Sequence, residues 1–165
     1  MLAAIKAQIE GNPISSTDHP LFLPVALLAI KRKIIGEQRD MLWRHLTDAE
    51  MQTGQTGAPM FRHYAQSGED DDINEITKQV IGVIQLSTAA EQHAKTLLTV
   101  LEAVQKSIQI IGETSGQRDI VQRVGEMLTE RLEFIEQKTK MLIFDLQYFE
   151  KRAQAQLTAD DVPLM

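Results

Sequence analysis

The sequence lacks cysteine and the residue spacings that mark common catalytic and metal sites. It contains no cysteine, which excludes disulfides, thiolate metal ligands and a cysteine nucleophile. Its histidines form no pair at the three- or four-residue spacing of a helical metal site. It has no glycine-rich phosphate loop and no serine in a nucleophile elbow. We therefore predict no catalytic residues, no certain cofactor and a protein that is not an enzyme.

The sequence also has no long apolar run and no excess of positive charge. The longest apolar run, Leu21–Ile30, is interrupted by Pro24. As a helix this run would be about 15 Å long, which is half the thickness of the hydrocarbon core of a bilayer. The net charge is −6, so the basic footprint of a nucleic-acid-binding protein is absent. We expect neither a membrane span nor a nucleic-acid partner.

What the sequence does contain is apolar residues that recur at alternating spacings of three and four. One run covers 73–111 and a second covers 121–153. Sustained spacing of this kind is typical of a coiled coil or a helical bundle. Gly112 and Gly116 enclose the turn between the runs, so we predict two long helices, over 72–112 and 117–159, that fold back on each other. The first run consists of Ile73, Ile76, Val80, Val83, Ser87, Ala90, Ala94, Leu97, Leu101, Val104, Ile108 and Ile111.

A third main helix is predicted over about 24–51, because Pro24 suits a first helical turn. A shorter helix is expected at residues 1–10, ended by Gly11-Asn12-Pro13. The predicted fold is therefore all-α, an antiparallel long-helix bundle or coiled coil with three main helices and a short N-terminal helix. Its expected segments are a short helix and turn (1–18), a first bundle helix (19–52), an acidic linker (53–71), a helical hairpin (72–159) and a frayed tail (160–165).

The linker ends in four consecutive acids, which have two interpretations. Glu69, Asp70, Asp71 and Asp72 can cap the following helix, since negative charge is favourable at a helix N-terminus. Their carboxylates are also the ligands that Mg²⁺ and Ca²⁺ prefer, although their spacing is not that of an EF-hand loop. The four acids are therefore both a predicted cap and a candidate Mg²⁺ site.

A second apolar stripe lies off the main repeat of the last helix. Phe134, Met141, Phe144 and Tyr148 would stay exposed in a hairpin of two helices. A further packing partner is therefore expected, which is either the helix over 24–51 or another chain. We predict from this stripe that the protein associates with itself or with another helical protein.

The only basic cluster of the first main helix is Lys31-Arg32-Lys33. It is either a solvated helix face or a contact with phosphate or lipid headgroups. Each charge would contribute about 1 kcal/mol to binding an anionic membrane surface.

Two segments together resemble the helical region of fungal CorA-like magnesium transporter proteins. The first is His19-Pro20-Leu21-Phe22-Leu23-Pro24, followed by a basic amphipathic helix. The second runs from Glu130 through Phe149-Glu150-Lys151-Arg152 to Thr158, and it is similar to the helix that leads towards the membrane in that family. The likeness covers about 19–159.

The resemblance implies the cytoplasmic helical stalk of such a protein, with Mg²⁺ as the ion. The family's two transmembrane helices and its Gly-Met-Asn signature have no counterpart before Met165, so no pore residue can be transferred. The expected location is cytoplasmic, as the soluble part of a membrane protein. The alternative is a self-contained coiled-coil adaptor that mediates protein–protein contacts.

Overall fold

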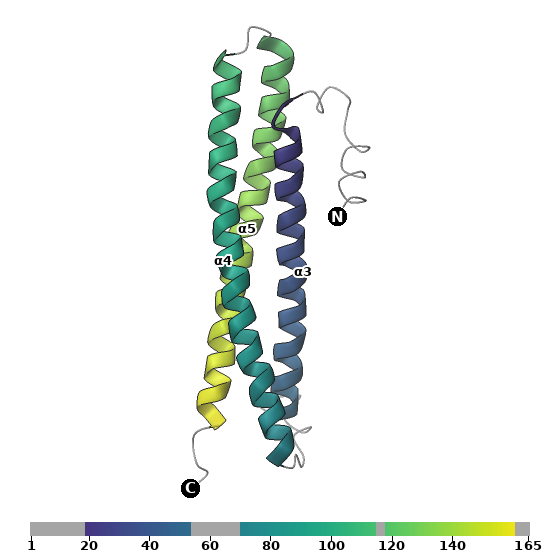
Figure 1. Ribbon diagram of the computed structural model, residues 1–165, viewed down its shortest axis with the longest axis vertical. Coiled ribbons are helices and arrows are strands. Elements are labelled where there is room, and N and C mark those ends of the chain that lie inside the picture. Colours follow the sequence, from purple (N-terminus) through teal and green to yellow (C-terminus); the bar gives the residue numbers. More distant parts are fainter. Residues whose placement is uncertain (1–18, 54–69, 115–117, 161–165) are drawn as a thin grey trace. The chain divides into compact units, whose positions relative to one another are not determined.

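The computed structural model describes residues 19–53, 70–114 and 118–160 as three long helices that pack against one another (Figure 1). They are α3 (Phe22–Thr53), α4 (Asp70–Thr114) and α5 (Arg118–Asp160). No strand occurs among these residues. The predictions of an all-α fold and of three main helices are confirmed. The short helix expected at residues 1–10 lies outside the described part of the chain.

Each helix contributes to two compact units. The first unit consists of Met1–Ile35 and His93–Met141, and the second of Gly36–Gln92 and Leu142–Met165. Within each unit, the segment of α4 runs antiparallel to the segments of α3 and α5 (Figure 1).

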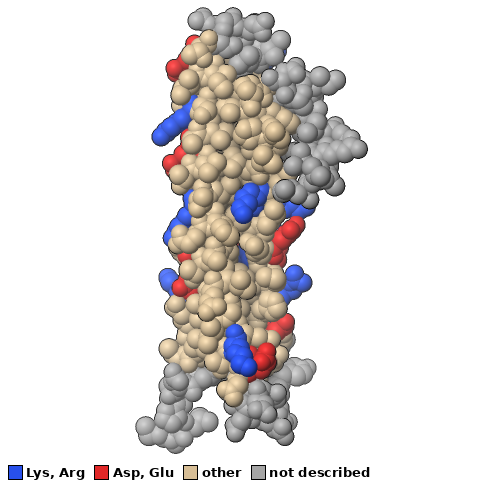
Figure 2. All heavy atoms as spheres, viewed as in Figure 1, with Lys and Arg blue, Asp and Glu red and all other residues tan. Residues whose placement is uncertain are grey.

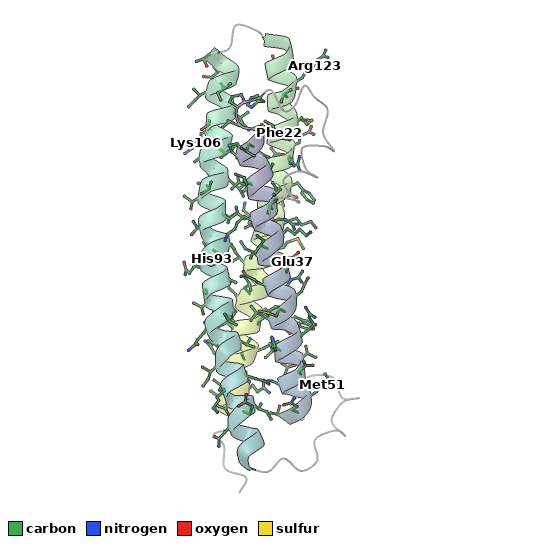
Figure 3. The ribbon with its side chains drawn as sticks, turned by 45° about the vertical axis from the view of Figure 1, so that its right-hand side comes forward. Phe22, Glu37, Met51, His93, Lys106 and Arg123 are labelled. Carbon is green, nitrogen blue, oxygen red and sulfur yellow. The ribbon has the colours of Figure 1, made fainter. Side chains whose placement is uncertain are left out.

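The start of α3 is fixed by His19 and by the prolines around it. The backbone N–H of Phe22 donates to the carbonyl of His19 at 2.9 Å, and that of Val25 donates to the carbonyl of Leu21 at 3.1 Å. His19 Nδ1 accepts the N–H of Leu21 at 3.2 Å. Pro24 lies in the first turn, where its missing N–H leaves no hydrogen bond unmade. Phe22 and Met51 mark the two ends of this helix in Figure 3.

The turn after α4 begins later than the sequence indicates. The helix continues through Gly112 to Thr114, whose hydroxyl donates to the carbonyl of Ile110 at 2.8 Å. Helix boundaries commonly differ by one or two residues, because helix ends fray.

The cores of both units are built from the predicted repeats. Ser87 is buried in the second unit, and its hydroxyl donates to the carbonyl of Val83 at 2.7 Å, one turn earlier. Thr139 is buried in the first unit and makes the same contact with Ile135, also at 2.7 Å. Gly125 brings α5 close to α4, since a Cβ at this position would lie 3.5 Å from Cγ2 of Ile108. The buried residues among the described side chains of α5 are Val124, Gly125, Leu128, Leu132, Ile135, Thr139, Leu142, Leu146, Phe149, Ala153 and Gln156.

Candidate contact surfaces

The predicted Mg²⁺ site lies outside what the structure describes in side-chain detail. Glu69 precedes the described residues, and Asp70, Asp71 and Asp72 are described only as the backbone of the first turn of α4. Among the described residues, no group of three or more His, Asp or Glu side chains could hold a metal ion. The acidic Mg²⁺ site therefore stays a prediction.

The described histidines do not come together. His45 and His93 are exposed, whereas His19 is buried in the first unit. Burial lowers the pKa of His19 from its ordinary value of 6.5, because desolvation disfavours the charged imidazolium. Since Nδ1 accepts the N–H of Leu21, the neutral ring carries its proton on Nε2, which is buried without a partner among the described residues. His19 is therefore a structural residue at the start of α3.

The predicted contact stripe of α5 is exposed. Phe134 and Met141, in the first unit, are 55% and 59% exposed. Phe144 and Tyr148, in the second unit, are 71% and 49% exposed. The sequence left open whether the helix over 24–51 covers these side chains. It does not: α3 packs on α5, and all four side chains still face solvent.

A cluster of aromatic rings around an arginine joins α3 to α5 in the second unit. The Arg152 guanidinium lies 5.0 Å from the ring centroid of Trp43 and 5.3 Å from that of Tyr148. Its Nε donates to Oε1 of Glu50 at 3.0 Å, and its Nη2 donates to Oε2 of the same carboxylate. The Trp43 ring packs at 5.5 Å from that of Phe149. Sequence analysis missed this cluster, because Glu50 and Arg152 are 102 residues apart and no local pattern links them.

Other polar contacts of the second unit attach α5 to both of its neighbours. Nη1 of Arg39 on α3 lies 3.3 Å from the carboxylate of Asp145. The Gln156 side-chain amide donates to the Thr53 hydroxyl at 2.8 Å. On α4, the buried Glu91 carboxylate accepts the side-chain amide of Gln147 at 2.6 Å. Hydrogen bonds of this kind fix the register between helices, because a shift would leave buried polar groups unpaired.

The first unit contains an open groove between α4 and α5. Its volume is about 360 Å³, and Ile108, Gly112 and Gly125 are among the residues that line it. Glu126 and Glu130 line it. Thr129 also lines the groove, and its hydroxyl donates to the backbone carbonyl of Gly125 at 2.9 Å.

Charged side chains of both signs are interspersed on the face that Figure 2 shows, and broad uncharged areas separate them. This mixture agrees with the sequence, which contains 17 Lys and Arg residues and 23 Asp and Glu residues. In the part of the chain that the structure describes, no helix has an apolar stretch long enough to cross a membrane.

Comparisons of the chain with protein-family models, with curated proteins and with solved structures found no match.

Proposed function

We propose that this chain is a non-catalytic helical module whose function is contact with other helices. Its contact surface is the exposed stripe of α5, formed by Phe134, Met141, Phe144 and Tyr148. The partner that we infer is a second copy of the chain. The observation that carries the proposal is the exposure of these four large apolar side chains on a helix that already buries its opposite side.

The area of the stripe supports this proposal. Aromatic side chains bury about 150–250 Å² each, so the three aromatic side chains of the stripe and Met141, which are 49–71% exposed, present about 400–500 Å² of surface. Patches of this size on a protein surface are often functional. Two copies would bury about 900 Å², and their flanking residues would bring the interface near the lower limit of about 1,200 Å² for a specific complex.

The spacing of the stripe also suits a second copy. Phe134, Met141 and Tyr148 are each seven residues apart, so the arrangement is symmetric about Met141. An antiparallel copy of α5 can therefore make the same contact on both sides of a two-fold axis, as isologous interfaces require.

Cysteine cross-linking tests the proposal directly, because the native chain has no cysteine that could interfere. Met141→Cys should form a disulfide between two copies under mild oxidation, visible as a dimer on non-reducing gels. Ile110→Cys on α4 is the matched control, since Ile110 is 60% exposed and Met141 is 59% exposed. Equal cross-linking of the two variants, or none for Met141→Cys, would exclude the stripe as the contact surface.

The sequence resemblance supports a more specific form of this proposal, in which the module is the cytoplasmic stalk of a CorA-like metal ion transporter protein. Its support is the pair of matching segments, His19–Pro24 at the start of α3 and Glu130–Thr158 within α5. If the stalk hypothesis holds, the natural transcript should continue beyond Met165 into two apolar runs of about twenty residues each. A stop codon directly after Met165 would favour the self-contained adaptor instead.

Mg²⁺ sensing by Glu69, Asp70, Asp71 and Asp72 belongs to the same hypothesis. Isothermal titration with Mg²⁺ should then give a binding heat that disappears when the four acids are replaced by their amides. Absence of heat in the native protein, or the same heat in the amide variant, would remove Mg²⁺ sensing from the proposal.

A further inference from the structure

Two residues of opposite charge flank the exposed stripe of α5. Glu130 lies four residues before Phe134, and Arg152 lies four residues after Tyr148. With Met141 in the middle, these residues follow one another at spacings of four, seven, seven and four, which are close to whole turns of a helix. They therefore share one side of α5. Glu130 and Arg152 are equally far from Met141 along the chain, so the two charges have the same centre as the apolar stripe.

The two charged groups differ in what they contact within the chain. Glu130 is exposed, and no ion pair or hydrogen bond joins its carboxylate to another of the described residues. Arg152 donates to Glu50 through Nε and Nη2, which occupies two of the five N–H groups of a guanidinium. The side chain of Arg152 is 23% exposed, so its other N–H groups are accessible to a second carboxylate from outside the chain.

These charges distinguish between the two orientations in which a second copy of α5 can pack on the stripe. A parallel copy would place Glu130 opposite Glu130 and Arg152 opposite Arg152, and like charges that face each other across an interface repel. An antiparallel copy centred on Met141 places Glu130 opposite Arg152 at both ends, because the two residues are equally far from the centre. Charge pairs of this kind set the orientation and register of associating helices.

We propose that Glu130 of one copy forms an ion pair with Arg152 of the other, at both ends of an antiparallel dimer. Each guanidinium then lies between two carboxylates, that of Glu50 in its own chain and that of Glu130 in the second copy. Glu50 is a positioning residue, because it holds the guanidinium in place before the second copy binds and so lowers the entropy cost of ordering it. The inference rests on the proposed self-association through the stripe, and it adds the orientation and register of the two copies.

Charge reversal at Glu130 tests the ion pair. Glu130→Arg should raise the dissociation constant of the dimer at least about fivefold, because an attraction becomes a repulsion at both ends. Sedimentation equilibrium measures this constant, and the effect should shrink at about 1 M salt, where the screening length is about 3 Å. The matched control is Glu102→Arg, which makes the same charge change at an exposed residue of α4 in the same unit. An equal weakening by the control, or native affinity for Glu130→Arg, would overturn the inference.

Cysteine variants test the orientation independently. In the antiparallel dimer the two copies of Met141 meet, whereas the two copies of Glu130 lie roughly 33 Å apart along the helix axis. A disulfide needs Cα atoms within about 7 Å, so Met141→Cys should cross-link two copies and Glu130→Cys should not. Cross-linking of both variants would indicate a parallel dimer, which overturns the inference and leaves the proposed self-association intact. A native chain that is monomeric in the ultracentrifuge would remove both. Circular dichroism at 222 nm verifies that each variant keeps its helices.

Discussion

The ion pair between Glu50 and Arg152 should stabilise the second unit more than any exposed ion pair of the chain. The side chain of Glu50 is 9% exposed and that of Arg152 is 23% exposed, so water screens this pair only partly. Breaking a fully buried pair by removing one partner costs about 3–5 kcal/mol, and a surface pair contributes at most about 1 kcal/mol. The intermediate exposure places the cost of Glu50→Gln at about 2 kcal/mol. Arg152→Met should cost slightly more, because the ring contacts with Trp43 and Tyr148 add about 0.5–1 kcal/mol.

A double-mutant cycle isolates the pair from these other effects. We expect a coupling free energy of about 1.5 kcal/mol between Glu50→Gln and Arg152→Met, within the range of residues in direct contact. Urea unfolding should be followed both by circular dichroism and by the fluorescence of Trp43, which is the single tryptophan and touches Arg152. Each single variant should lower the melting temperature by about 4–8 °C for a chain of this size.

The exposed pair of Glu136 and Lys140 is the control for this cycle. These residues are four apart on α5, and their side chains are 31% and 62% exposed. Their coupling free energy should be at most about 0.5 kcal/mol. If the coupling between Glu50 and Arg152 were no larger than this, the argument that burial strengthens the pair would be wrong.

Three further predictions concern single positions. Ile35→Ala should destabilise the fold by about 3 kcal/mol, because Ile35 is fully buried, whereas Ile34→Ala should stay within about 0.5 kcal/mol of the native protein; urea unfolding measures both. Since burial lowers the pKa of His19 below 6.5, the folded chain binds fewer protons than the unfolded chain. The contribution of His19 to stability is therefore complete above pH 6.5 and is lost as the pH falls through the folded-state pKa, so His19→Gln should flatten the dependence of the urea midpoint on pH. Gly82→Ala should raise the free energy of unfolding by about 0.5–1 kcal/mol, because no atom lies within 4 Å of the added Cβ; a lower urea midpoint would contradict this.

The helices and their buried sides could be predicted from the sequence because the information is local. A repeat of three and four residues places one side of a helix against its neighbours, whatever those neighbours are. The second repeat is buried from Leu128 to Ala153, as the pattern predicts. These positions are Leu128, Leu132, Ile135, Thr139, Leu142, Leu146, Phe149 and Ala153. Even the polar Ser87 was expected within the first repeat, since its hydroxyl can donate to its own helix.

The contacts between helices could not be predicted, because they depend on the register of one helix against another. Glu50 and Arg152, or Glu91 and Gln147, look like solvated residues in the sequence, and only packing brings them together. The same is true of the α5 stripe. The sequence indicated that a hairpin would leave it exposed, but only the positions of the helices show that α3 lies on α5 without covering Phe144.

The molecular mass of the protein in solution tests the proposed contact function most directly. It should be measured by light scattering after size exclusion, at rising concentration and with or without millimolar Mg²⁺. The proposal predicts a discrete oligomer for the native chain, and a monomer with unchanged helix content for Phe134→Glu combined with Phe144→Glu. A native chain that stays monomeric at every concentration, or a variant that keeps the native mass, would contradict it.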